Sequence, residues 1–230
     1  MLRTLLRHLV TLCPVLLVAA LTGASQDRPS VFQSWNQVQL IVPVTRSTDA
    51  EGKSVNKVTA IIDGIARLGR DVDLTDGRLG IEFDFRANKH VTFITSALYR
   101  ADEIVENARH YEARLAVGAT FSPAWKRVSL RDRNLYEYRV RRGRNDISVY
   151  RTRLQISVPV KHNGKILFSP FLSEEAFYDF HADRFNNNEL FLGITRRLNP
   201  RTELDVAYIR NDTAPANVNG LSLNLKITLR

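Results

Sequence analysis

Residues 221–229 read L-S-L-N-L-K-I-T-L, and this stretch decides the fold. Leu or Ile stands at every odd-numbered position, whereas Ser, Asn, Lys and Thr stand at the even-numbered ones. Because successive side chains of a β-strand point to opposite faces, one face of this segment is wholly apolar and the other is wholly polar. The pattern predicts a β-strand that separates two different environments.

The same alternation recurs through most of the chain after residue 30, and helical spacing never outscores it for more than about a turn. Strands are predicted at residues 32–42, 57–68, 79–86, 91–100, 111–121, 127–140, 150–160, 166–180, 188–196, 202–210 and 221–229. Most of these segments run about 9 to 14 residues, longer than the five or six typical of soluble β-domains. They match the roughly 9 to 11 residues with which a tilted strand crosses a bilayer.

The connections between these segments also follow a pattern. Short turns at 87–89, 122–124, 162–164 and 199–200 alternate with longer polar loops at 101–109, 141–146, 181–186 and 211–218. Outer-membrane barrels combine short periplasmic turns with longer surface loops. We therefore predict an all-β protein with a single antiparallel up-and-down transmembrane β-barrel of 10–12 strands. Since antiparallel closure requires an even number of strands, 10 or 12 is expected.

The N-terminus has the three parts of a secretory signal. Arg3 and Arg7 precede an apolar run at 9–21, and Thr22-Gly23-Ala24 supplies small residues at a cleavage site. The run is shorter than the roughly 20 residues of a spanning helix, although an uncleaved anchor is the alternative. We predict a cleaved signal peptide at 1–24 and a barrel at 25–230. The chain's single cysteine, Cys13, lies within the predicted signal.

The formal charge of +9 raises the question of an anionic partner. The sequence contains no nucleic-acid-binding motif, and an exported protein seldom meets a genome. Expected partners are therefore outer-membrane lipid and lipopolysaccharide, with barrel-assembly machinery and periplasmic chaperones during biogenesis. No cofactor and no metal site is predicted, because the spacing of potential ligands matches no metal motif.

Alternation alone leaves open which face meets the solvent. In a soluble lipid-binding barrel of the periplasm the apolar face would point inward, whereas in a membrane barrel it would meet lipid and the charged face would line the lumen. Five aromatic residues on the apolar faces favour the membrane arrangement because several lie near strand ends, as in an interfacial girdle: Tyr111, Phe121, Tyr136, Tyr138 and Tyr150.

The most distinctive constellation is a ladder of charges on the polar faces. Its predicted members are Arg131, Arg133, Glu137, Arg139, Arg151, Arg153, Glu112, Arg114, Glu174, Glu175 and Asp179. Neighbouring strands lie about 4.8 Å apart, so these groups can form ion pairs across the lumen wall. One interpretation is structural, with the charges filling and rigidifying a narrow barrel. The other is an anion path or a site for a phosphorylated lipid or sugar, since guanidinium groups suit phosphate and carboxylate.

An enzymatic barrel is the alternative of a different class. A lipid-modifying hydrolase or acyltransferase of the outer membrane would need a Ser and a His converging at one rim. His110 is the only histidine within a predicted strand, and Glu112 shares its face. The available serines lie in no recognisable nucleophile motif, so no catalytic residue is predicted and a non-catalytic barrel is favoured.

Several stretches of sequence resemble a known family. They are Trp35, R-D-R-N at 131–134, Y-R-T-R-L-Q at 150–155, S-P-F-L-S-E-E-A-F-Y-D-F at 169–180, F-N-N-N-E-L-F-L-G at 185–193, E-L-D-V-A-Y at 203–208 and N-G-L-S-L-N-L at 219–225. Together they resemble an uncharacterised family of bacterial outer-membrane β-barrels, the domain of unknown function 2490 family. The resemblance implies the outer membrane of a Gram-negative bacterium and supplies no substrate. The sequence thus predicts a structural or small-solute, porin-like barrel with an Arg/Glu-lined interior.

Overall fold

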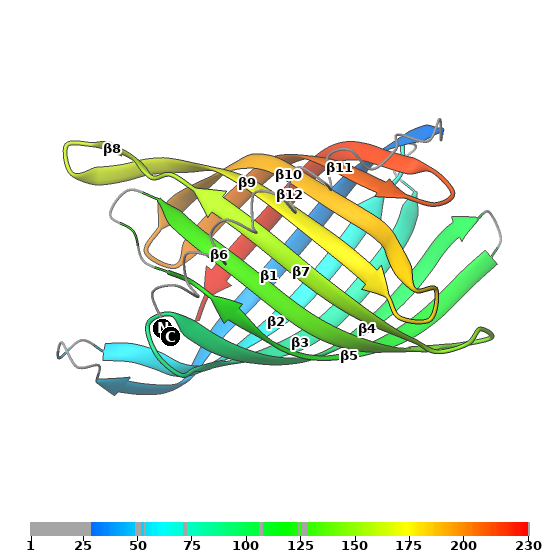
Figure 1. The fold of residues 1–230 in the computed structure, drawn as a ribbon. Helices are drawn as coiled ribbons and strands as arrows, with labels where there is room; N and C mark the ends of the chain where they lie inside the picture. Colours follow the sequence, from blue (N-terminus) through cyan, green and yellow to red (C-terminus); the bar gives the residue numbers. More distant parts are fainter. Residues whose placement is uncertain are drawn as a thin grey trace, which may run out of the picture.

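A computed structural model describes residues 29–48, 52, 54–70, 73–105, 108–123, 125 and 128–229. The predicted signal peptide, residues 1–24, lies outside the described residues. Within the described part the chain is all-β, and its strands wrap into a tilted barrel (Figure 1). None of the described residues belongs to a helix long and apolar enough to cross a membrane.

The strands follow the predicted segments but extend beyond most of them. They are β1 (Ser30–Thr48), β2 (Ser54–Leu68), β3 (Leu74–Arg86), β4 (Val91–Val105), β5 (Ala108–Phe121), β6 (Ser129–Arg141), β7 (Ile147–Ser157), β8 (Val160–His162), β9 (Lys165–Asp179), β10 (Arg184–Asn199), β11 (Thr202–Thr213) and β12 (Asn217–Thr228). Each strand pairs with its sequence neighbour in antiparallel fashion, except that β7 pairs with β9. The short β8 pairs only with the start of β9, and together they form a hairpin that projects from one rim (Figure 1).

The barrel closes through an unexpected pairing. β1 and β12 run parallel, from Ser30 opposite Asn217 to Ile41 opposite Thr228. The closed ring in the described part therefore contains eleven strands, within the predicted range of 10–12. The expectation of an even, wholly antiparallel ring is wrong, because a parallel ladder also satisfies the backbone donors and acceptors of both edges. An odd ring requires one such pair.

Two predicted loops are also largely strand. β4 and β5 leave only two residues between them, and β11 and β12 are separated by 214–216. The segments 101–109 and 211–218 are polar, but the backbone ladder does not depend on side-chain polarity, and such residues can continue a hairpin beyond the bilayer. The predicted tight turn at 162–164 is confirmed, since Asn163 and Gly164 both have positive φ, as a type I′ hairpin requires.

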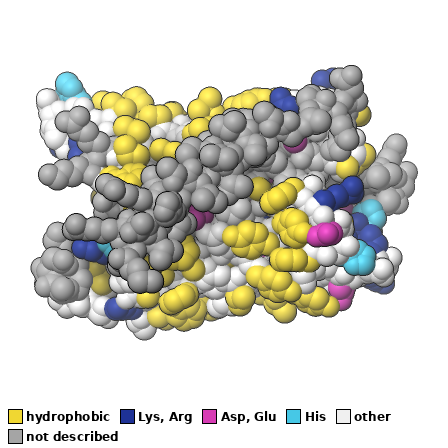
Figure 2. Space-filling model, viewed as in Figure 1, with side chains coloured by type: hydrophobic (Ala, Val, Ile, Leu, Met, Phe, Trp, Pro, Cys, Tyr) yellow, Lys and Arg dark blue, Asp and Glu magenta, His cyan; other side chains and the backbone are white. Residues whose placement is uncertain are grey.

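The barrel is apolar outside and charged inside. Leu79, Leu115 and Leu192 are each more than half exposed, whereas Glu137 and Glu175 are 3% exposed. Hydrophobic side chains cover much of the described surface between the two ends, and charged side chains gather towards the ends (Figure 2). This distribution is the reverse of that in a soluble barrel and contradicts the soluble lipid-binding alternative. The fold is that of a transmembrane β-barrel.

Aromatic side chains on the outer surface lie near both rims. Tyr136, Tyr138, Tyr150 and Phe121 are exposed, as their alternation predicted, and Tyr111 stacks on another tyrosine with ring centroids 6.3 Å apart. Near the rim that holds residues 180–183, further aromatic side chains pack edge to face, with centroids 5.2 Å apart. Aromatic rings at this level suit the boundary between hydrocarbon and head groups.

Candidate functional site

The lumen holds one continuous cavity of about 1350 Å³. On β1 its lining runs from Ser30 to Ile41, and on β11 it runs from Glu203 to Thr213. These stretches cover most of each strand, so the cavity extends from one rim of the barrel towards the other. Polar side chains supply many of the lining residues, which favours a water-filled interior.

Cations outnumber carboxylates in the cavity wall. The lining contains 14 basic residues (Arg67, Arg70, Arg78, Arg100, Arg114, Arg131, Arg133, Arg139, Arg141, Arg144, Arg151, Arg153, Arg184 and Lys226) and 11 acidic ones (Asp63, Asp76, Glu82, Asp84, Asp102, Glu112, Glu137, Asp179, Glu189, Glu203 and Asp205). The basic residues are concentrated on β6 and β7, which contribute six arginines but only one of these acids. The wall opposite, formed by β11, β12 and β1, presents several amides and carries only two acids, Glu203 and Asp205, and one cation, Lys226, among its described lining residues. The lumen is therefore polarised across its width.

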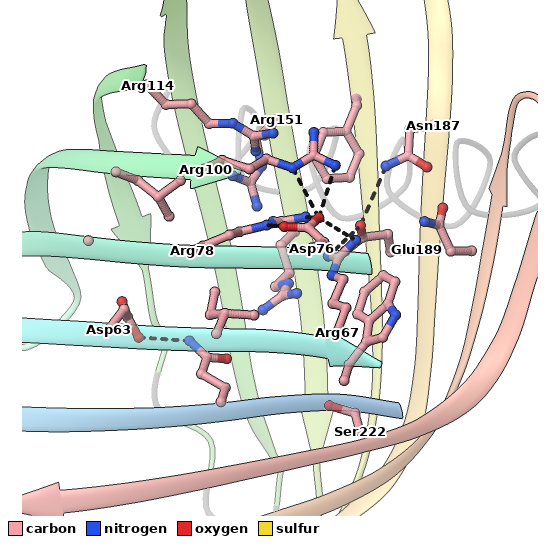
Figure 3. Close-up of a pocket in the computed structure, with 18 of the residues that line it drawn as sticks. Asp63, Arg67, Asp76, Arg78, Arg100, Arg114, Arg151, Asn187, Glu189 and Ser222 are labelled. Carbon is pink, nitrogen blue, oxygen red and sulfur yellow. Dashed lines mark hydrogen bonds and ion pairs between the residues drawn. The ribbon is translucent and has the colours of Figure 1, made fainter. Parts of the chain in front are cut away.

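One end of the lumen is organised around Asp76, which is 3% exposed. Its carboxylate pairs with Arg78 at 2.6 Å and Arg100 at 2.9 Å, and lies 3.8 Å from Arg67 (Figure 3). Three cations on three neighbouring strands thus share one carboxylate. Such a cluster is stable only if further acceptors or water balance the excess charge. Arg67 and Arg100 do find further acids, Glu189 at 3.6 Å and Asp102 at 2.8 Å.

A second network follows the predicted ladder. Glu137 accepts Arg139 at 2.7 Å and also pairs with Arg151. Arg151 reaches Glu175 at 2.7 Å, and Arg153 binds the other oxygen of that carboxylate at 2.8 Å. Positive and negative side chains therefore alternate along this series of contacts, which crosses β6, β7 and β9. Each carboxylate serves two guanidinium groups, so the network locks neighbouring strands together.

Two ion pairs join strands that are not neighbours. Arg67 on β2 meets Glu189 on β10 at 3.6 Å, and Arg133 on β6 pairs with Glu82 on β3. In the ring, β1, β12 and β11 separate the first pair, and β4 and β5 separate the second. These contacts bridge parts of the wall that the sheet itself does not join. They narrow the lumen.

Aromatic residues within the lumen were missed by the sequence analysis. Trp35 is 6% exposed and packs against Phe191, with ring centroids 6.1 Å apart. The guanidinium carbon of Arg67 lies 3.3 Å from the centre of the Trp35 ring, and Arg151 stacks at 4.8 Å over Phe177. Cation–π stacking of this kind holds arginine side chains in place. The signal was visible in Trp35, which stands among glutamines on the polar side of its strand.

The structure brings most of the predicted ladder together in the lumen, with one exception. Glu112 pairs with Arg114 at 2.5 Å, and Asp179 accepts the backbone N–H of His181 at 2.8 Å near the rim. Glu174 was expected in the ladder but lies on the outer face, where it accepts a hydrogen bond from Asn188 at 2.9 Å. Its strand alternates strictly, so only one of the two adjacent glutamates can face inward.

Four residues outside the predicted ladder prove central to the lumen network: Arg67, Asp76, Arg78 and Arg100. Asp76 falls outside the predicted strand 79–86, and Arg100 is the last residue of the predicted strand 91–100. The predicted strands therefore did not place these two residues on adjacent strands. The alternation of β3 does continue through Asp76, Arg78 and Glu82. That continuation is the signal that could have revealed them.

His110 is paired with an acid. Its ring nitrogen Nδ1 lies 3.2 Å from Asp102, which also pairs with Arg100. In the described part of the chain, no serine or threonine hydroxyl hydrogen-bonds to His110. Likewise, no group of three or more His, Cys, Asp or Glu side chains among the described residues has the arrangement of a metal site.

A closed β-barrel with an apolar exterior and a charge-lined lumen defines a porin-like transmembrane barrel. The chain belongs to the family described as "Protein of unknown function (DUF2490)", whose model matches residues 32–220. Among solved structures, the chain is similar to an anion-selective porin from Comamonas acidovorans, with 15% identity and a TM-score of 0.37. That alignment covers 76% of this chain and 58% of the porin chain. No curated protein matches the sequence.

Proposed function

We propose that this barrel provides a narrow, hydrated path for small solutes and that the path prefers anions. The observation that carries the proposal is the cavity of about 1350 Å³, which runs along most of the length of β1 and β11. A solute path requires a continuous, polar cavity of this size, whereas a purely structural barrel does not. The cross-lumen pairs of Arg67 and Arg133 restrict the path to small species.

The preference for anions follows from the charge of the wall. The cavity is lined by 14 basic and 11 acidic residues, and β6 and β7 present arginines in succession. Fixed positive charge in a narrow, low-dielectric passage raises the local concentration of anions and lowers that of cations. Glu137 and Glu175 each neutralise parts of two arginines, so the excess is modest and a moderate selectivity is expected.

Planar-bilayer recording tests this function directly. Protein refolded in detergent is first shown to be closed by a boiling-dependent shift on a detergent gel, then inserted between unequal KCl solutions. We expect small, discrete conductance steps and a reversal potential whose sign shows that chloride permeates more readily than potassium. A folded, heat-modifiable protein that never conducts would overturn the proposal and leave the structural interpretation. A cation-selective reversal potential would overturn the anion preference.

We further propose that the barrel resides in the outer membrane of a Gram-negative bacterium. Its apolar exterior and aromatic rims support this location, and lipid with lipopolysaccharide would then surround it. The barrel-assembly machinery and periplasmic chaperones are the proposed partners during biogenesis. Cell fractionation tests the location: sedimentation with the outer membrane is expected, whereas release in the soluble fraction without detergent would contradict it.

A further inference from the structure

A small niche lies beside the main cavity, between β6 and β7. It has a volume of about 30 Å³ and is lined by Arg131, Arg133, Arg153 and Gln155. All four residues also line the main cavity, so the niche adjoins the lumen. A volume of 10 to 15 Å³ on this measure admits about one water molecule. The niche therefore has room for about two waters, or for the head of a small anion whose remainder stays in the lumen.

The strand register places like charges opposite each other at this point. Arg133 is the direct partner of Arg153, and Arg131 is the partner of Gln155. Like charges directly opposite in an antiparallel pair repel and destabilise the sheet unless something between them compensates. Three guanidinium groups on two adjacent strands therefore converge on one niche.

The ion pairs of these arginines do not use all of their N–H donors. Arg133 pairs with Glu82 and Arg153 binds Glu175 at 2.8 Å, in both cases through Nη2. The Nε atoms of both arginines are nevertheless buried and have no hydrogen-bond partner. Arg131 forms no ion pair within 4.0 Å among the described residues. The Arg133 and Arg153 side chains are 24% and 33% exposed, so parts of both guanidinium groups stay accessible although each is paired with an acid.

The surrounding acids do not cancel this charge. Glu175 is shared with Arg151 at 2.7 Å, so it serves Arg153 only in part. Asp84 interacts electrostatically with Arg131 and Arg133 but forms no ion pair with either. Its charge opposes anion binding and lowers the expected affinity. Three arginines lie at the niche. Glu82 pairs with Arg133, Glu175 is shared between Arg151 and Arg153, and Asp84 acts from beyond ion-pair distance, so positive charge remains in excess.

We propose that the niche binds a small oxyanion, a carboxylate or phosphate group entering from the lumen. Such a group offers two or more acceptor oxygens to the guanidinium groups of Arg131, Arg133 and Arg153, while the Gln155 side-chain amide can donate to it as well. This inference rests on the proposed anion path and adds a specific anion-binding site near one end of it. An anion there would offset the repulsion between Arg133 and Arg153, which lie directly opposite each other on β6 and β7.

Calorimetry on refolded protein in detergent micelles tests the niche without relying on conductance. Sodium acetate and sodium phosphate are the two probes, each titrated at constant ionic strength against a chloride background. The variants Arg131→Gln and Arg153→Gln each remove one guanidinium from the niche. Arg141→Gln is the matched control, because Arg141 lies on the same strand, lines the same cavity and instead donates to the Asn145 carbonyl at 2.6 Å. Heat-modifiability confirms that every variant folds.

We expect at least one probe to bind, with an affinity reduced about tenfold or more in Arg131→Gln and Arg153→Gln, since each loses a charge-assisted hydrogen bond. Arg141→Gln should stay within about twofold of the parent protein. Whichever probe binds more tightly identifies the class. Absence of binding by both probes, or an equal loss in Arg141→Gln, would overturn the site. If the barrel binds a probe but does not conduct, the oxyanion site stands and the proposed path is overturned. If the barrel conducts but binds neither probe, the path stands and the oxyanion site is overturned.

Discussion

At the residue scale, two adjacent glutamates have opposite surroundings. Glu175 is 3% exposed and pairs with Arg151 and Arg153, whereas Glu174 lies on the outer face beside Asn188. We expect Glu175→Gln to lower the free energy of unfolding by roughly 2 to 4 kcal/mol, because two arginines lose one partner while lumen water moderates the cost. Glu174→Gln should leave it unchanged or raise it, since a charge leaves the lipid-facing surface.

Urea unfolding of the two variants in detergent measures both effects, and they serve as controls for each other because the chemical change is the same. Equal destabilisation by the two substitutions would contradict the assignment of the faces. A larger cost for Glu174→Gln would place the lumen on the other side of β9.

At the element scale, the closing seam depends on a glycine. A Cβ placed on Gly220 of β12 would lie 1.8 Å from the carbonyl oxygen of Gln33 on β1. The strands approach so closely there that Gly220→Ala must displace backbone, which we expect to cost about 1 to 3 kcal/mol of stability. Gly64→Ala is the control, because a Cβ there meets nothing within 4 Å. Refolding yield and urea unfolding measure the difference, and equal behaviour of the two variants would argue against the tight seam.

The parallel direction of the seam can be tested by cross-linking. Gln37 lies opposite Asn224 and Gln39 opposite Lys226, an order that only a parallel pair produces. In a Cys13→Ser background, Gln37→Cys with Asn224→Cys should form a disulfide, since paired strands hold Cα atoms within disulfide range. Gln39→Cys with Ser222→Cys should not, because four residues of offset separate them by about 13 Å. A disulfide in the second variant would indicate an antiparallel closure, whether or not the first variant also cross-links.

At the scale of the whole molecule, the ion pair of Arg67 and Glu189 crosses the lumen at 3.6 Å. Its arginine also stacks on Trp35, and both residues line the cavity. We expect Arg67→Ala to raise the single-channel conductance and reduce the preference for anions, because a cation and an obstruction disappear together. The rim variant Arg210→Ala, which breaks the exposed pair with Asp212, is the control and should change neither property. An unchanged conductance in Arg67→Ala would show that the narrowest point lies elsewhere.

Much of this architecture could be predicted from the chain, and the limits have clear causes. Period-two alternation identified the barrel strands and placed the ladder from Arg131 to Arg153 on the polar faces, because side-chain direction in a strand is a local property. The turn at Asn163-Gly164 followed from local chemistry as well. At Asp76 the strand continues beyond its alternating apolar residues, so the predicted strand was too short.

Sequence by itself therefore determined that the protein is a two-faced β-barrel with arginine-rich strands. Tertiary structure alone decided the number and direction of the closing strands, the bridges from Arg67 to Glu189 and from Arg133 to Glu82, and the niche between β6 and β7. The physical reason is range. Alternation is written residue by residue along one strand, whereas ring closure and contacts across the lumen depend on how distant strands are staggered and on the width of the barrel they enclose.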